Sequence, residues 1–247
     1  MVMNKVAENE TVLSKDKFQT KLEEALNSNV TLDHPIFEEF LRPEQNWLLL
    51  RMMTLQAYQI TKHFLEYVEN LYFYCPNPIH KRRLLINLFE EVTGRISKTK
   101  NHVSLMEDFI RAIGISDKER DSVKAFPETQ ELIDYRMEHV KNLDKYHMGA
   151  AAVMIASEGQ SLETKAGEGK DGILSRIYNL KEEDLLFFTV HAKEDVGHVK
   201  EGLALVSELC TTAEMQKEAI EAIRHTCDLF RGMYDGVAKR YYAQEAS

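Results

Sequence analysis

Residues 43–74 read PEQNWLLLRMMTLQAYQITKHFLEYVENLYFY, and this stretch decides the fold class. Its apolar residues form a broad stripe at the three- and four-residue spacing of an α-helix, so the helix should be deeply embedded. Pro43 suits the N-terminal end of that helix, and the breaker Cys75-Pro76-Asn77-Pro78 ends it. A long buried helix of this kind predicts a helical bundle.

Helical patterns continue on both sides of this stretch. The other main helices are expected at roughly 14–27, 79–93, 102–113, 127–158, 181–210 and 213–243, with short helices near 35–42 and 173–179. Only 11 glycines and 5 prolines occur in 247 residues, which favours long helices over a β-sandwich or barrel. No internal repeat or linker divides the chain, so residues 13–247 should form one all-α bundle of about seven main helices.

Two segments fall outside this helical pattern. Residues 1–12 are polar and are expected to form a flexible tail. Residues 159–172, GQSLETKAGEGKDG, are rich in glycine and charge and predict a solvated loop. A lid over a binding site is the alternative interpretation of this loop.

Charge and cysteine content narrow the function classes. The chain has 31 Lys and Arg against 40 Asp and Glu, a formal net charge of −9, which argues against a protein that binds nucleic acid or anionic membranes. Cys75, Cys210 and Cys227 are widely spaced and form no Cys-x-x-Cys motif, so free cysteines in a reducing compartment are expected. The N-terminus lacks an apolar signal core, and no stretch approaches the ~18 apolar residues of a membrane span. These features predict a cytoplasmic protein.

Residues 187–202, FFTVHAKEDVGHVKEG, carry the strongest chemical signal. At ~100° per residue, His191, Asp195 and His198 project from one stripe of a helix that is ~60° wide. The residues before them are apolar, so two imidazoles and a carboxylate emerge from a helix that should be largely buried. Buried polar groups need partners, and one metal ion would supply a partner for all three. An exposed charged face is the alternative, because other charged residues lie nearby.

Three further residues are candidates for the same site. Glu158 closes the apolar run at the end of the helix expected at 127–158. Glu91 shares a helical face with apolar residues, whereas Glu90 is rotated by ~100° and should meet solvent or a basic neighbour. His102 begins the next expected helix, where its imidazole can converge with the carboxylate of Glu91. Taken alone, each of these residues is also compatible with an ordinary structural role.

Together, these residues form a set of three carboxylates and three imidazoles from four expected helices. The set is Glu91, His102, Glu158, His191, Asp195 and His198. Nitrogen and oxygen ligands without a thiolate suit iron or manganese. The charge of the carboxylates is compatible with one or two divalent ions, but six ligands spread over two ions leave open positions for O2 and a substrate. Helical bundles are known hosts of such carboxylate-bridged metal pairs.

The motifs resemble those of the haem-oxygenase-like di-iron oxidases and oxygenases. This superfamily includes thiaminase-II-like proteins, pyrroloquinoline-quinone synthase and the death-domain-associating proteins implicated in p-aminobenzoate synthesis. The segment NLFEE-x-x-G leading to His102 is similar to the first Glu/His pair of the family. Glu158 resembles the lone Glu of its central helix, and His191-x-x-x-Asp195-x-x-His198 resembles its last triplet. The resemblance covers nearly the whole chain in helix order and implies that all six residues are metal ligands.

The resemblance implies an O2-dependent non-haem di-iron oxidase or oxygenase that acts on a small organic metabolite. Its cofactor would be two iron ions, with manganese or a mixed pair also suited to the ligands, and O2 would be the co-substrate. Tyr58, His63 and Tyr67, at helical spacing, are candidate pocket residues, with an aromatic core stripe as the alternative. The expected partner is a small-molecule substrate, and a homodimer is a common outcome for such bundles.

Two other functions remain open from the sequence. One is a metal-free oxidase like pyrroloquinoline-quinone synthase, or a hydrolase, on the same fold, since fold does not fix function. Metal analysis of the purified protein separates this function from a di-iron enzyme. The other is a helical protein-interaction module, which would be favoured if all six candidate ligands faced solvent.

Overall fold

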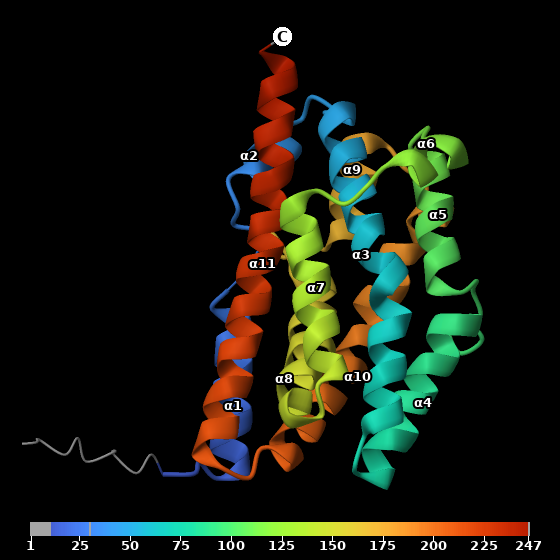
Figure 1. The fold of residues 1–247 in the computed structure, drawn as a ribbon. Coiled ribbons are helices and arrows are strands. Elements are labelled where there is room, and N and C mark those ends of the chain that lie inside the picture. Colours follow the sequence, from blue (N-terminus) through green and yellow to red (C-terminus); the bar gives the residue numbers. More distant parts are fainter. Residues whose placement is uncertain (1–10, 30, 247) are drawn as a thin grey trace, which may run out of the picture.

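A computed structural model describes residues 11–29 and 31–246 of the chain. Within these ranges the protein is an all-α bundle (Figure 1), so the predicted fold class is confirmed. Most of the tail predicted at residues 1–12 lies outside the described residues. None of the helices in the described ranges combines the length and the apolar character that crossing a membrane requires.

The helices follow one another with short connections. They are α1 (Lys15–Asn27), α2 (Ile36–Phe40), α3 (Trp47–Tyr74), α4 (Pro78–Thr93), α5 (His102–Ala112), α6 (Asp117–Ser122), α7 (Pro127–Lys141), α8 (Tyr146–Ala151), α9 (Lys170–Tyr178), α10 (Leu186–Leu209) and α11 (Ala213–Glu245). The 3-10 turns are η1 (Leu143–Lys145), η3 (Gln160–Leu162) and η4 (Glu182–Leu185), and η2 (Ala152–Ser157) is a π-helix. All main helices except the one expected at 127–158 lie close to their predicted positions.

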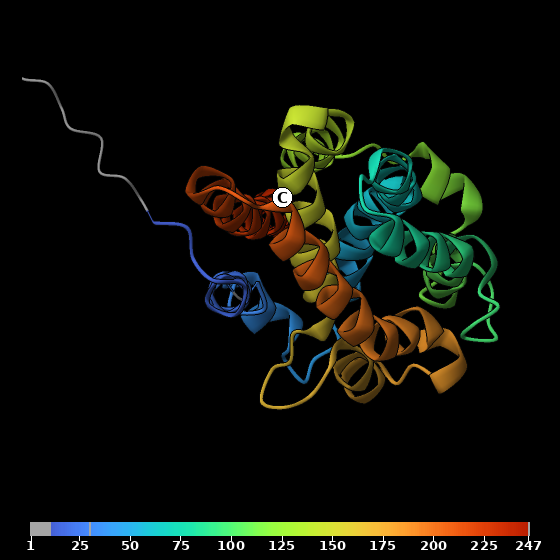
Figure 2. The same ribbon diagram turned by 90° about the horizontal axis from the view of Figure 1, so that it is seen from below.

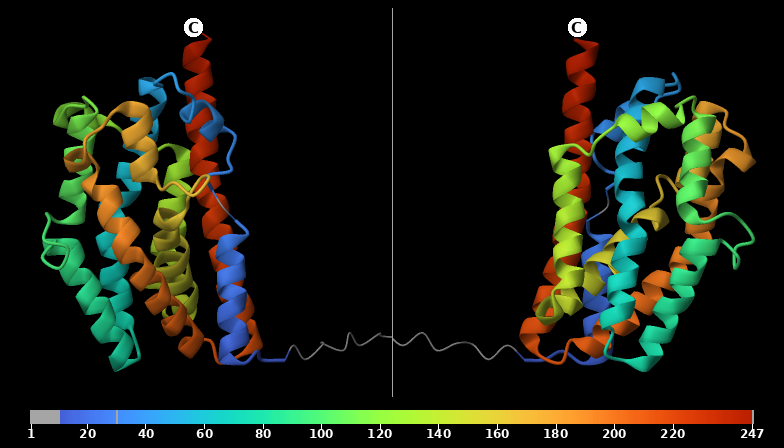
Figure 3. Two further views of the ribbon diagram at one scale, coloured as in Figure 1. Left: turned by 180° about the vertical axis from the view of Figure 1, so that it is seen from behind. Right: turned by 45° about the vertical axis from the view of Figure 1, so that its right-hand side comes forward.

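α3 is the embedded helix that its apolar stripe predicts. It packs against α4, α5, α7, α8 and α11 (Figure 1). α11 runs beside α1, α7 and α8, while α10 crosses the bundle obliquely (Figures 2 and 3). Through this oblique course α10 contacts α4, α5 and the π-helix η2, which are the elements that carry the other candidate ligands.

The helix expected at 127–158 is not continuous, which corrects the prediction. After α7, Asn142 caps the 3-10 turn η1 by accepting a hydrogen bond from the Asp144 N–H at 3.0 Å. α8 then packs back against α7 (Figure 1). Gly149 allows this close approach, since a Cβ there would lie 2.9 Å from the backbone of His139. A local side-chain cap, which competes with the helical backbone pattern, therefore ends α7.

Two buried apolar clusters stabilise the bundle, and the polar residues of α10 fall between them. One cluster combines α2, α5, α9, the N-terminal half of α3 and the C-terminal half of α11. The other combines α1, α8, η2, the C-terminal half of α3 and the N-terminal half of α11. Along α10, Phe188 packs against the first cluster and Val199 belongs to the second, so residues 191–198 lie between the two cores.

Residues 159–172 are partly fastened to the bundle, so the prediction of a solvated loop holds for only part of the segment. Gln160 is buried, and only residues 164–167 are exposed throughout. The Glu163 carboxylate accepts hydrogen bonds at 2.8 Å from both the backbone N–H and the hydroxyl of Thr31. These contacts hold the first part of the segment against the connection between α1 and α2.

Candidate metal centre

Four elements supply the six residues that the sequence predicts as ligands. α10 contributes three of them, and α4, α5 and the end of η2 contribute one each. The structure groups them in two clusters: Glu91, His102 and His191 in one, and Glu158, Asp195 and His198 in the other. In each cluster, one possible ligand atom from every residue lies within 4.8 Å of the others. None of the six is fully exposed, so the condition that would favour an interaction module is not met.

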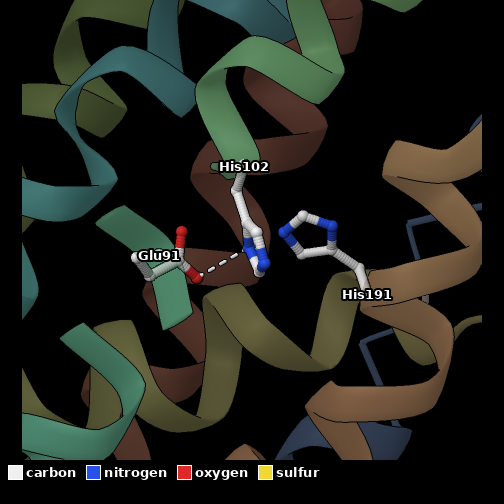
Figure 4. Close-up of side chains that lie close together, drawn as sticks. All are labelled: Glu91, His102 and His191. Carbon is white, nitrogen blue, oxygen red and sulfur yellow. Dashed lines mark ion pairs between the residues drawn. The ribbon is translucent and has the colours of Figure 1, made fainter. Parts of the chain in front are cut away.

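The first group, which we call the Glu91 cluster, lies where α4 and α5 meet α10 (Figure 4). The Nδ1 atom of His102 is 3.0 Å from Oε1 of Glu91. The rings of His102 and His191 have centroids 4.6 Å apart, and the two side chains point toward one another (Figure 4). The Nδ1 atom of His191 lies 2.6 Å from the carbonyl oxygen of Phe187, so it donates there and leaves Nε2 free to act as a ligand.

The second group, the Glu158 cluster, joins the end of the π-helix to α10. Nδ1 of His198 lies 3.4 Å from Oε1 of Glu158 and 3.2 Å from Oδ1 of Asp195. Ser161 donates a hydrogen bond to Asp195, and the side-chain amide of Asn87 donates to Oε1 of Glu158 at 3.3 Å. These donors hold the two carboxylates in place from the η3 turn and from α4. A π-helix beside them is typical of functional sites.

Unpartnered polar atoms show that the Glu91 cluster suits a cation. Oε1 of Glu91 and both ring nitrogens of His102 are buried without a hydrogen-bond partner among the described residues. The Glu91 and His102 atoms are close, but they are not aligned for a hydrogen bond. Buried polar atoms left unpaired are costly. A divalent ion between these ligands would satisfy them together, so the residues present fit a metal.

The connection between α4 and α5 sets the position of His102. Gly94 ends α4 in the left-handed region, at φ 61°. Glu90, which the sequence predicts to meet solvent or a basic neighbour, is buried, and its Oε1 lies 3.6 Å from Nε2 of His102. The solvent alternative is therefore wrong, and the basic neighbour is His102. The Glu90 carboxylate accepts hydrogen bonds from the N–H groups of Ile96 at 2.6 Å and Ser97 at 3.1 Å. The loop therefore folds over Glu90, and these hydrogen bonds fix its course to His102, the first residue of α5.

Glu194 is a candidate ligand that the sequence reasoning missed. Its Oε2 lies 3.8 Å from Nε2 of His102 and has no hydrogen-bond partner among the described residues. Glu90, Glu194 and His102 form a third group that could hold a metal ion. The available signal was spacing, because Glu194 lies three residues after His191 and so shares its side of α10. In the sequence alone, Glu194 is one of several charged residues that flank His191 and Asp195.

Burial and mutual charge shift the protonation of the two clusters. Burial opposes a charge on His102, but Glu91, Glu194 and Glu90 outweigh it and raise its pKa to about 9. Burial likewise opposes a charge on His198, yet the carboxylates of the Glu158 cluster raise its pKa well above the usual range. Burial and the charge of Asp195 raise the pKa of Glu158. Without metal, both imidazoles therefore carry protons at pH 7.

Metal uptake at pH 7 should therefore release about three protons per loaded chain, because His102 and His198 bind metal only as neutral imidazoles and Glu158, whose pKa is raised to about 8, binds it only as a carboxylate. The apparent affinity for iron should fall as the pH is lowered, since protons compete for the same nitrogens. Anaerobic calorimetric titration with Fe(II), in buffers of different ionisation enthalpy, measures this release. The variant His102→Ala should release about one proton fewer. Uptake without proton release would contradict the assignment of these histidines.

A cavity of about 180 Å³ lies against both clusters. Glu91, His102, His191, Glu158 and Asp195 are part of its wall. The rest of the wall is largely apolar and includes Phe64, Phe187, Phe188, Phe230 and Met233. A second, apolar cavity of about 120 Å³ shares Lys170, Phe188 and Tyr234 with the first. The arrangement places a small cavity beside a group of metal ligands, as in many cofactor sites.

The predicted pocket residues of α3 do not line this cavity. The Tyr58 hydroxyl donates to Glu107 at 3.0 Å, and His63 is partly exposed beside Glu66. Tyr67 is buried and donates to a backbone carbonyl, although its ring packs on a cavity residue. The helix contributes different side chains to the wall, namely Ala57, Ile60, Thr61 and Phe64.

Comparison with known sequences agrees with the geometry of the clusters. A family described as "Iron-containing redox enzyme" matches residues 51–231. A 4-aminobenzoate synthase of Nitrosomonas europaea is 26% identical over 242 residues, which cover 94% of this chain and 95% of that protein. A 4-aminobenzoate synthase of Chlamydia muridarum is 24% identical over 218 residues, which cover 88% and 89%.

Solved structures show the same architecture. A haem-oxygenase-like domain from Shewanella denitrificans superimposes with a TM-score of 0.71 at 18% identity, covering 95% of this chain and 96% of that one. A TenA homolog from Pseudomonas syringae superimposes with a TM-score of 0.72 at 15% identity, covering 96% of this chain and 98% of that one. A CADD-like protein of unknown function from Nostoc punctiforme superimposes with a TM-score of 0.70 at 15% identity, covering 92% of this chain and 97% of that one. The haem-oxygenase-like fold expected from the sequence is thus confirmed.

Proposed function

This chain belongs to the family of iron-containing redox enzymes, and from that premise we propose that it is an O2-dependent non-haem di-iron oxidase or oxygenase acting on a small organic metabolite. One observation carries the proposal: two three-residue ligand clusters lie against one cavity. A single cluster would suggest a structural ion, whereas two neighbouring clusters beside one cavity suit a pair of redox metals.

Each cluster would hold one ion. Glu91, His102 and His191 are the ligands of the first, and the Glu158 cluster holds the second. Iron bound there supplies the activation of O2, which no side chain of the protein can perform. Manganese or a mixed pair would use the same ligands. Glu194 is available as a further carboxylate on the Glu91 side.

The residues around the clusters keep the ligands oriented. The Phe187 carbonyl fixes the ring of His191, and Ser161 and Asn87 hold the carboxylates of the second cluster. Such supporting contacts commonly change metal affinity or activity 10- to 100-fold when they are removed, so they belong to the working site.

The apolar wall of the cavity would exclude water and receive the substrate. Its aromatic residues include Phe187, Phe188 and Phe230. A water-poor site strengthens electrostatic interactions with the substrate and limits side reactions of activated oxygen. The relatives named 4-aminobenzoate synthases make 4-aminobenzoate the first product to look for, and a small aromatic acid the favoured class of metabolite.

Anaerobic reconstitution with Fe(II) followed by exposure to O2 tests the proposal. We expect up to about two irons per chain, O2 uptake that depends on the iron, and an oxidised product detectable by mass spectrometry, with 4-aminobenzoate sought first. Zinc-loaded protein is the control, because zinc occupies such ligands without redox chemistry. Equal O2 uptake by chelator-treated protein would instead favour a metal-free oxidase.

A further inference from the structure

We propose that Arg136 anchors a carboxylate group of the organic ligand in the cavity beside the two metal clusters. The inference deepens the proposed function, on which it rests, because it assigns the ligand to the class of small organic acids. Arg136 lies on α7, contributes to the wall of the 180 Å³ cavity, and has no assigned role among the metal ligands.

Arg136 is a buried cation without a counterion. Its side chain is 1% exposed, and it is among the largest fully buried side chains of the described residues. No carboxylate of residues 11–29 or 31–246 pairs with it within 4.0 Å. Charged groups are rarely buried unless they are paired, because the protein interior solvates them poorly. A negatively charged ligand would supply the missing partner.

The guanidinium is held in one orientation, and one of its nitrogens has no hydrogen-bond partner among the described residues. Nε donates to the Leu132 carbonyl oxygen at 3.2 Å, and Nη1 donates to the Ser157 hydroxyl at 3.2 Å. The rings of Tyr67 and Phe230 lie on it, with centroids 4.7 and 5.6 Å from the guanidinium carbon. Nη2 is buried and has no hydrogen-bond partner among the described residues. A planar, pre-oriented group of this kind suits a carboxylate.

The position of Arg136 relates the ligand to the metals. Ser157, which accepts from Nη1, directly precedes Glu158 in the chain, and Arg136 and Glu158 both line the cavity. The carboxylates in the cavity wall would repel an organic acid, and Arg136 is a cavity cation that can offset this repulsion. A carboxylate held there leaves the rest of the ligand against the apolar wall that includes Phe230 and Met233.

The size of the cavity fits an acid with one ring. Its volume of about 180 Å³ exceeds the ~150 Å³ of an engineered apolar cavity that binds benzene. Lys170 is the other cation in the wall, and its amine donates to the Gln160 carbonyl oxygen at 2.7 Å. Arg136 is preferred as the anchor because its Nη2 is buried without any partner among the described residues, and Lys170 is the rival to be tested.

Calorimetric binding to iron-loaded protein, kept free of O2, tests the proposal with 4-aminobenzoate and 4-aminobenzamide as probes. The two probes have nearly the same shape, but only the first carries a charge. The wild-type protein should bind the acid at least about tenfold more tightly than the amide. Arg136→Gln should lose this preference while retaining iron, and Arg136→Lys should restore part of it.

Each outcome decides the question. Equal binding of the two probes by the wild-type protein overturns the proposal, even if a variant fails to fold. Loss of the preference in Lys170→Met but not in Arg136→Gln would move the anchor to Lys170 and also overturn it, as would tighter binding of inorganic phosphate than of 4-aminobenzoate. Iron loading and O2 uptake are measured separately, so a failure of the di-iron function is distinguishable from a failure of this site.

Discussion

Replacing Asp195 with alanine should leave the bundle folded but abolish turnover, with bound iron falling from about two ions per chain to about one or fewer. Asp195 is 1% exposed, and its Oδ1 lies 3.2 Å from Nδ1 of His198. The substitution removes one of the three ligands of the Glu158 cluster and the carboxylate that orients His198. The fold should survive, because the charge of Asp195 disfavours the ionised form of Glu158 in the metal-free protein.

The matched control for this variant is Glu201→Ala, which removes a carboxylate from the same helix but outside both clusters. Iron is counted by elemental analysis, folding is followed by circular dichroism, and turnover by O2 uptake. The control should match the wild-type protein in all three. A folded Asp195→Ala protein with unchanged iron content would show that this residue is not a ligand.

Gly94→Ala should have the second large effect, on both stability and iron binding. A Cβ at this position would lie 2.1 Å from the Lys100 carbonyl oxygen and 2.7 Å from that of Thr99, at a φ of +61°. The clash involves backbone atoms, so the loop that closes over Glu90 must move. We expect the free energy of unfolding to fall by about 2–4 kcal/mol and the Glu91 cluster to lose affinity for iron, because the same loop leads to His102.

Gly167→Ala separates the clash from the backbone conformation. Gly167 also has a positive φ, of +81°, but a Cβ there would meet no atom within 4 Å. The variant Gly167→Ala should therefore lower the free energy of unfolding by only about 1–2 kcal/mol, the ordinary penalty of the left-handed region, and leave iron binding unchanged. Urea unfolding of both variants gives the comparison. If Gly94→Ala is no more destabilising than Gly167→Ala, the loop does not position His102 in the way described.

Hydrophobic periodicity was sufficient to predict most helices, but not where the chain turns between them. The stripe of residues 43–74 predicted the embedded helix α3. The same reasoning joined α7 to α8 and η2, because the residues on both sides of the turn remain helical in character. The turn depends on the Asn142 cap and on the close packing of Gly149, which are set by contacts rather than by a change of period.

The candidate site was predictable where ligands share one helix. His191, Asp195 and His198 lie on one stripe of α10, so their spacing alone suggested that they act together. Convergence with Glu91 and Glu158 depends on tertiary packing, which spacing does not contain; the family resemblance supplied it. That the six residues bind metal stays a prediction, and the structure adds that their side chains meet in two groups.

Two buried charged residues differ in how far the sequence predicts them. Rotation around α4 suggested that Glu90 meets solvent or a basic neighbour, but the following loop folds back and buries it near His102. Arg136 in α7 follows the buried Leu132 and Ile133 by four and three residues. That spacing puts it on the buried face of the helix, which was the available signal. A charged residue on the buried face of a helix needs a partner, and the sequence alone does not show which group supplies it.

Anomalous diffraction at the iron edge, from crystals of protein loaded with Fe(II) without O2, tests the di-metal centre most directly. We expect two iron peaks at the cavity wall, one bound by Glu91, His102 and His191, and the other by Glu158, Asp195 and His198. Absence of iron at the cavity, or iron held only by residues outside these two clusters, would contradict the proposed di-iron function.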